Sequence, residues 1–187
     1  MTDITFGNPD YYTIKEKESF GMWPDLALPA WGILPYLKRL PEPVSGILVG
    51  VGKGENAHVL SNNLNIKELW GIDPYVPYRD IDTDRTQEDV DNYLKTMEKN
   101  LEGYNFGLVS GTGLSDDTYD FLMIDTQKTV AEDLELFYPK LRKGGYVWGG
   151  LNNLLVVMDG LRTFRDKNKV RVPINHSKNF VWFWRKA

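Results

Sequence analysis

The chain has 187 residues, 42% of them hydrophobic, which allows one domain with a substantial core but not a cofactor domain plus a separate substrate domain. A net charge of −4 argues against nucleic acid or an anionic membrane as an electrostatic partner and favours a small, neutral or cationic substrate. Because there is no cysteine, disulfides, thiolate nucleophiles and cysteine-based zinc sites are excluded. No apolar run approaches the ~18 residues of a membrane span and no secretion signal is present, so we expect a cytoplasmic protein.

Residues 1–45 are dense in aromatic side chains and prolines. Aromatic clusters serve core packing and binding pockets alike. The segment is therefore either core that packs across a sheet or a lid over a cofactor that also supplies part of the substrate pocket. A short helix is expected between Trp31 and Leu40. Residues 46–187 then form a single globular domain.

The next segment, ILVGVGKG at residues 47–54, predicts a buried strand, a tight turn and a helix that continues to about Leu64. Glycines let the backbone turn sharply and let a ligand lie against it, and the first N–H groups of the helix are partly positive. Such turns hold nucleoside-bearing cofactors, although an ordinary strand-to-helix turn has the same composition. The dinucleotide pattern G-x-G-x-x-G fails, because its third position is Glu55, a carboxylate where a pyrophosphate would approach.

Two later strands end on an acid. Residues 68–73 predict a strand that ends at Asp73, about 20 residues after the glycine turn, where a carboxylate can accept both hydroxyls of a ribose or can cap the next helix. A third strand is expected at 106–109, followed by a turn at 110–113. A fourth, at 119–125, ends at Asp125.

The rest of the chain predicts alternating helices and strands. Thr129 with Glu132 resembles a capping box, for a helix whose Leu134, Phe137 and Leu141 face inward. A fifth strand, one more helix and two closing strands at 170–174 and 180–184 follow. The fold class is therefore α/β: a doubly wound, mostly parallel seven-stranded sheet with helices on both faces and an antiparallel last strand.

This order, together with GVGKG, the strand-end Asp73, YDFLMID, LRKGGYVW and FVWFW, resembles the class I S-adenosylmethionine (AdoMet) methyltransferases over about residues 45–187. Residues 119–145 look most like small-molecule O-methyltransferases of the macrocin and catechol O-methyltransferase kind. The G-x-G-x-G turn of that family holds a cofactor that has no phosphate and carries a sulfonium and an ammonium. The resemblance implies the following cofactor contacts: Gly50, Gly52 and Gly54 at the methionyl part of AdoMet, Asp73 at its ribose, Thr112 and Gly113 near its adenine, and Asp125 on the sulfonium side.

Lys128 lies three residues after Asp125, where catechol-type enzymes carry a lysine that takes the acceptor hydroxyl's proton. The resemblance therefore implies Lys128 and Asp125 as catalytic residues. Methyl transfer to a hydroxyl needs a base, and a lysine near a sulfonium can have its pKa lowered enough to serve. The alternative for Lys128 is a solvated lysine before a helix.

The sequence departs from the family at two places. Leu48 stands where an acid usually precedes the first glycine, and Gly149-Gly150-Leu151 replaces the acids of metal-dependent relatives. Asp125 with two nearby asparagines would make a poor magnesium site, so no metal is expected. We expect AdoMet-dependent O-methylation of a small molecule, with no nucleic-acid or membrane partner. The departures also fit a non-catalytic AdoMet-binding or scaffold protein. A nicotinamide-dependent oxidoreductase is disfavoured by Glu55 and by the absence of a second domain.

Overall fold

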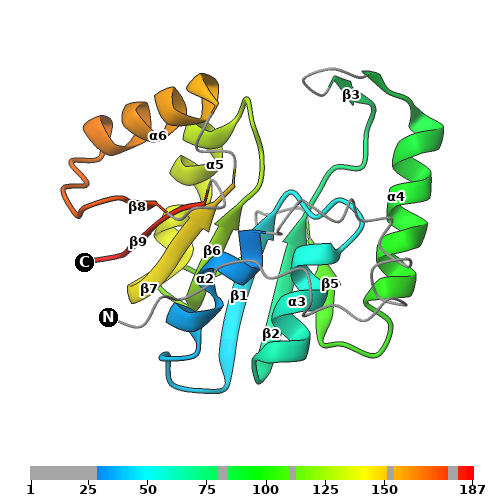
Figure 1. The fold of residues 1–187 in the computed structure, drawn as a ribbon, viewed down its shortest axis with the longest axis horizontal. Helices are drawn as coiled ribbons and strands as arrows, with labels where there is room; N and C mark the ends of the chain where they lie inside the picture. The colour runs from blue at the N-terminus through cyan, green and yellow to red at the C-terminus, as the bar shows by residue number, and fades with distance from the viewer. Residues whose placement is uncertain (1–28, 80–83, 110–112, 151–153, 177–180) are drawn as a thin grey trace.

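The computed structural model describes residues 29–79, 84–109, 113–150, 154–176 and 181–187. Its central element is a seven-stranded sheet in the order β5-β2-β1-β6-β7-β9-β8 (Figure 1). The strands of this sheet are β1 (Val44–Val49), β2 (Ile66–Ile72), β5 (Phe106–Leu108), β6 (Tyr119–Ile124), β7 (Leu141–Gly149), β8 (Asn175–His176) and β9 (Trp182–Arg185). A separate two-stranded ribbon consists of β3 (Tyr78–Arg79) and β4 (Asp84–Arg85).

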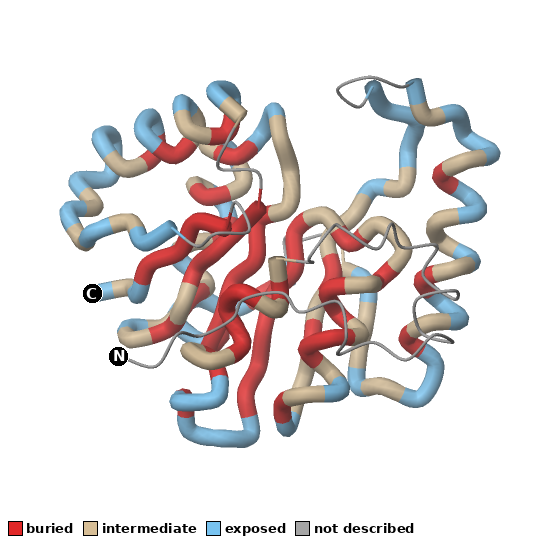
Figure 2. The backbone as a smooth tube through the Cα atoms, in the orientation of Figure 1, coloured by how far each residue is buried: buried red, intermediate tan, exposed pale blue. Residues whose placement is uncertain are grey.

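Strand direction confirms the predicted fold class. β1 pairs in parallel with β2 and β6, and further parallel pairs join β2 to β5 and β6 to β7. β9 runs antiparallel to both of its neighbours, β7 and β8. β1 and β6 lie in the middle of the sheet, and all of their residues are buried (Figure 2). Strands buried in this way need a cover on both faces of the sheet.

Helices supply that cover. One core joins the sheet to α2, α3 and α4, and the other joins it to α5 and α6. The helices are α2 (Pro29–Leu37), α3 (Glu55–Asn63), α4 (Gln87–Asn100), α5 (Val130–Phe137), the 3-10 turn η2 (Tyr138–Lys140) and α6 (Leu155–Lys167). In the described parts of the chain, no helix is long and apolar enough to cross a bilayer.

The N-terminal segment is described only from α2 onward. This helix confirms the expected one and begins two residues earlier, at Pro29. Its buried Ala30, Ile33 and Leu37 belong to the same core as Trp148 and Phe183 of the sheet. Residues 1–28 of the expected lid lie outside the described residues, so the role of the segment as a lid stays a prediction.

The expected capping box before α5 is wrong. The Thr129 side chain makes no cap hydrogen bond to the helix backbone. Its hydroxyl instead donates to the Asp133 carboxylate at 2.8 Å, which also accepts from the Thr126 hydroxyl at 2.6 Å. Leu141 is buried as expected, but it opens β7 and does not belong to the helix.

The penultimate strand lies later than predicted, at Asn175–His176 in place of 170–174. The earlier residues fold back on the end of α6. The Val170 N–H donates to the Arg165 carbonyl at 2.9 Å, and Nη2 of Arg165 donates to the Val172 carbonyl at 2.6 Å. Because these backbone groups are satisfied by α6, the β-branched run does not pair with the sheet.

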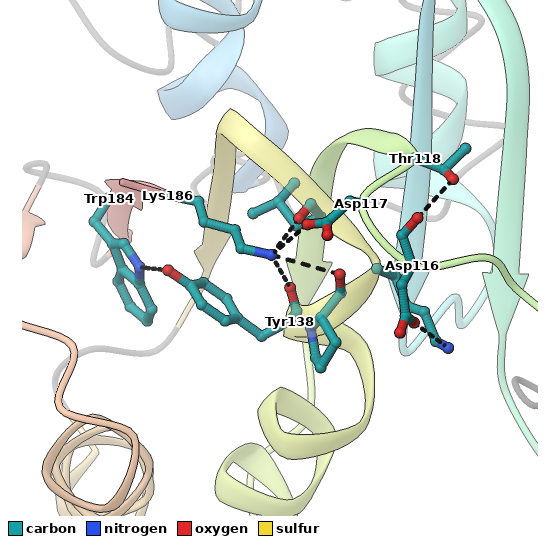
Figure 3. A network of polar contacts seen from close by, with 9 residues as sticks. Asp116, Asp117, Thr118, Tyr138, Trp184 and Lys186 are labelled. Carbon is teal, nitrogen blue, oxygen red and sulfur yellow. Dashed lines mark hydrogen bonds and ion pairs between the residues drawn. The ribbon is translucent and has the colours of Figure 1, made fainter.

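The end of the last strand is held by Lys186 (Figure 3). Its ammonium donates to the carbonyl oxygens of Tyr138 and Pro139, at 3.1 and 3.4 Å, and of Leu141. It also pairs with Asp117 at 3.1 Å, and the side chain is only 16% exposed. One charge therefore ties the C-terminal end of the chain to η2 and to the first residue of β7.

Candidate functional site

The glycine turn lies at the carboxyl edge of the parallel strands. The Gly50 N–H donates to the Ile72 carbonyl at 2.9 Å, and the Asp125 N–H donates to the Val49 carbonyl at 2.8 Å. These bonds place the turn between the residues that follow β2 and those that follow β6. Ligands of open α/β sheets bind at this edge of the sheet.

The three glycines of the turn all have positive φ angles, but they have different neighbours. A Cβ at Gly50 would lie 2.7 Å from the Asp125 carbonyl oxygen, and one at Gly54 would lie 3.1 to 3.2 Å from Leu101 and Met97. Internal packing therefore explains these two glycines. A Cβ at Gly52 would meet, among the described residues, nothing nearer than a Glu55 carboxylate oxygen at 4.0 Å. The described residues thus leave the Cα side of Gly52 unobstructed.

Asp73 closes the turn from the side of β2. One of its carboxylate oxygens accepts hydrogen bonds from the N–H groups of Val51 and Gly52 at 2.9 and 3.0 Å, and the other accepts from the Tyr75 N–H at 3.0 Å. The Tyr75 hydroxyl donates to the Gly52 carbonyl at 2.8 Å. An ionised carboxylate has about four acceptor positions, so these three bonds leave room for a ligand hydroxyl. Asp73 fixes the shape of the turn as well as being a candidate ribose acceptor.

Asp125 faces the turn from the side of β6. Its half-buried carboxylate accepts a hydrogen bond from the Asn56 side-chain amide at 3.3 Å. Burial, and secondarily the negative charge of Glu55, raises the pKa of Asp125 from 3.8 to about 6. Asn56 is itself buried, and its side-chain oxygen accepts from the Ala30 N–H at 3.0 Å. The first turn of α2 is therefore joined to the same cluster.

Glu55 is the first residue of α3 and lies over the open side of Gly52. Burial raises the pKa of this carboxyl, although backbone hydrogen bonds and the positive charge of Lys53 act in the opposite direction. The Lys53 ammonium lies 5.1 Å from the centre of the Tyr93 ring on α4. Among the described residues, the carboxylates of Glu55, Asp73 and Asp125 thus lie at the turn, together with the Lys53 ammonium.

Three predicted site residues, Lys128, Gly113 and Thr112, lie outside this hydrogen-bonded cluster or outside the described residues. Lys128 is exposed between β6 and α5. Gly113 lies at the end of the turn after β5, where a Cβ would meet nothing within 4 Å in the described part of the chain. Thr112 lies outside the described residues, as do Leu151, Asn152 and Asn153. Across the described ranges, no group of three or more histidine, aspartate or glutamate side chains is placed to hold a metal ion.

Sequence reasoning missed the contacts of three residues. It used Glu55 only to argue against a dinucleotide, and it gave no role to Asn56 or Tyr75. Asn56 has no local signal in the sequence, because only the structure shows that this amide is buried and needs polar partners. Tyr75 has a weak sequence signal, because it is an aromatic residue two positions after the strand-end acid Asp73. That its hydroxyl reaches Gly52 depends on the tertiary structure.

Several solved structures share the fold of this chain. The O-methyltransferase NovP superposes with a TM-score of 0.64 at 15% identity, over 84% of this chain and 79% of that one. The fold is that of the Rossmann-like methyltransferases. The tRNA (m1A58) methyltransferase TrmI from Aquifex aeolicus gives a TM-score of 0.59 at 16% identity, over 84% of this chain and 68% of that one. A SAM-dependent methyltransferase, also from Aquifex aeolicus, gives 0.55 at 17% identity, over 82% and 86%.

These identities show a shared fold and leave the acceptor open, since the methyltransferase fold here matches an O-methyltransferase and a tRNA methyltransferase alike. No family model matches the chain, and no curated protein sequence matches it.

Proposed function

We propose that this protein binds AdoMet at the glycine turn and transfers its methyl group to an oxygen of a small molecule. The observation that carries the proposal is the unobstructed Cα side of Gly52, in a turn that the carboxylates of Glu55, Asp73 and Asp125 face. A turn with this charge is suited to a nucleoside cofactor that carries a sulfonium and an ammonium, and unsuited to a pyrophosphate.

Each residue has a distinct part in this proposal. Asp73 accepts a ribose hydroxyl with the acceptor capacity that the turn leaves free. Asp125 faces the sulfonium, and Asn56 orients its carboxylate. Gly113 and Thr112 border the adenine. Gly50 and Gly54 have no side chain, so Asp125 can pack against the first and Leu101 and Met97 against the second, which maintains the shape of the turn.

When bound, AdoMet supplies an activated methyl group that an acceptor oxygen takes by in-line displacement, while the C–S electron pair stays on sulfur and S-adenosylhomocysteine is formed. The acceptor proton must go to a base in the protein. Lys128 is the first candidate, and its exposed position makes it accessible to a substrate that enters from solvent. Asp125 is the second, because a carboxyl with a pKa of about 6 is largely ionised at neutral pH.

The exposure of Lys128 also supports an alternative function, that of an AdoMet-binding protein without acceptor chemistry. A catalytic lysine usually needs a desolvated setting to lower its pKa. Cofactor binding with no turnover across a broad panel of acceptors would favour this alternative.

Calorimetric titration with AdoMet tests the binding step. Gly52→Ala should weaken binding at least tenfold, because the added methyl group would occupy the ligand's approach to the backbone. The control is Gly103→Ala, in the loop between α4 and β5, which also has a positive φ and nothing within 4 Å of its Cβ position in the described residues. Both variants suffer similar backbone strain, so equal AdoMet affinity in the two would contradict the assignment of the site.

A further inference from the structure

Both backbone polar groups of Gly52 are hydrogen-bonded from the side of β2. Its N–H donates to an Asp73 carboxylate oxygen at 3.0 Å, and its carbonyl accepts from the Tyr75 hydroxyl at 2.8 Å. Gly52 is also the glycine of the turn whose Cα side the described residues leave unobstructed. Asp73 is a proposed cofactor contact, whereas the proposed function gives Tyr75 no part.

The backbone of Tyr75 is strained. Its φ angle is 46°, in the left-handed region that bulky side chains rarely adopt. Such a conformation persists only where neighbouring contacts hold it, and it is found mainly at functional sites. The Tyr75 N–H donates to the second Asp73 carboxylate oxygen at 3.0 Å. The hydroxyl reaches Gly52, and the ring packs against the core that joins the sheet to α3 and α4. Contacts at both ends of Tyr75 therefore hold a backbone that would be unfavourable without them.

The Tyr75 hydroxyl fixes the peptide that joins Gly52 to Lys53. This peptide is trans, so its carbonyl and its N–H point in opposite directions. The carbonyl accepts from Tyr75, and the N–H on the other side donates to the Glu55 carboxylate. A peptide next to a glycine is otherwise free to rotate, because glycine has no Cβ to limit its dihedral angles. The two bonds therefore hold this peptide in one orientation.

Burial keeps the Tyr75 hydroxyl a hydrogen-bond donor. Tyr75 is half-buried, and burial raises the pKa of its phenol well above the usual value. The negative charges of Asp73, Glu55 and Glu98 raise this pKa further. The phenol therefore stays protonated at neutral and moderately alkaline pH and keeps its bond to Gly52.

We propose that Tyr75 is a positioning residue for the cofactor, because its hydroxyl holds the Gly52–Lys53 peptide in the orientation that AdoMet binds. The inference rests on the proposed function and adds to it a residue that acts through the turn. A turn that already has its bound conformation loses less conformational freedom on binding, so the ligand binds more tightly. Without the hydroxyl, AdoMet must order this peptide as it binds, and its affinity falls.

The experiment is calorimetric titration of the full chain with AdoMet. Tyr75→Phe removes the hydroxyl but keeps the ring and the main-chain hydrogen bond to Asp73, so the variant retains its packing. AdoMet affinity should fall about three- to tenfold, the effect of one hydrogen bond.

The matched control is Tyr104→Phe. Tyr104 is also a half-buried tyrosine of the same core, but its hydroxyl donates to the Asn62 side chain at 2.6 Å, near the far end of α3 from the turn. This variant should bind AdoMet as wild type does. Urea unfolding of both variants checks that they are folded under the conditions of the titration.

A second ligand separates a positioning role from a purely structural one. 5′-Methylthioadenosine has the adenosine and the sulfur of AdoMet but lacks its amino-acid group. The family resemblance places Gly52 at the methionyl part of AdoMet and Asp73 at its ribose, and Tyr75→Phe leaves the hydrogen bonds of Asp73 in place. The affinity for 5′-methylthioadenosine should therefore stay within about twofold of wild type. A general loss of structure would weaken the binding of both ligands.

Each result has a distinct meaning. Wild-type AdoMet affinity in Tyr75→Phe would overturn the inference, and so would equal losses of affinity for the two ligands, while the proposed function would stand. If 5′-methylthioadenosine does not bind wild type, the comparison of AdoMet affinity with Tyr104→Phe decides alone. If AdoMet does not bind wild type, the proposed function fails and the inference fails with it.

Discussion

Asp125→Asn should make the protein more stable at neutral and alkaline pH. A carboxyl whose pKa rises from 3.8 to about 6 on folding is harder to ionise in the folded state than in the unfolded state. At pH 8 this difference destabilises the folded state by about 3 kcal/mol. Because Asp125 is half-buried, solvent screening lowers the expected gain to about 1 to 3 kcal/mol. The asparagine keeps an oxygen that can accept from Asn56.

The sign of the pH dependence follows from proton binding. Between the unfolded value of 3.8 and the folded value of about 6, the folded state binds more protons than the unfolded state, so stability falls as pH rises. The advantage of Asp125→Asn should therefore shrink to about 1 kcal/mol or less at pH 4.5. It should reach its full value above pH 7.

Urea unfolding at pH 4.5 and pH 8 measures this difference. The control is Asp91→Asn. Asp91 is an exposed acid on α4 that accepts a hydrogen bond from Gln87. This substitution should change the free energy of unfolding by less than about 0.5 kcal/mol at either pH. If Asp125→Asn is less stable than wild type at pH 8, or if its advantage does not vary with pH, burial does not perturb Asp125 and the reasoning is wrong. A stabilised variant that binds AdoMet more weakly would show a carboxylate retained for function at the expense of stability.

Three further predictions concern other parts of the molecule. Lys186→Met should lower the free energy of unfolding by about 1 to 3 kcal/mol, because three carbonyl groups lose the hydrogen bond from the ammonium, and Lys186→Arg should lower it less; urea unfolding checks both. If Lys128 is the base, Lys128→Met should slow turnover by about 10² to 10⁴ and leave AdoMet affinity unchanged, whereas turnover at the wild-type rate would remove Lys128 from the mechanism. Activity should survive EDTA, and a loss reversed by added magnesium would reveal a metal ligand that the Gly149-Gly150-Leu151 segment does not suggest.

The sequence by itself determined the order of the sheet strands and the edge of the sheet at which the candidate site lies. Glycine spacing, apolar runs and strand-end acids are local signals, and the rules of parallel connection convert them into a topology. They placed the glycine turn, Asp73 and Asp125 at one edge, where the structure has them. The sequence was less reliable where local propensity competed with tertiary contacts, as for residues 170–174, whose backbone is satisfied by α6.

Only the tertiary structure decided what each site residue contacts. Gly50, Gly52 and Gly54 are equivalent in the sequence, yet two of them are required by internal packing and the third is unobstructed by the described residues. Asp73 was expected to bind a ribose, but it also holds the turn by three backbone hydrogen bonds. The Ala30 N–H of α2, the Asn56 side chain of α3 and the Asp125 carboxylate after β6 come together over distances in the chain that no local pattern spans. The charge around Gly52 is therefore a property of the fold, although every residue that creates it is visible in the sequence.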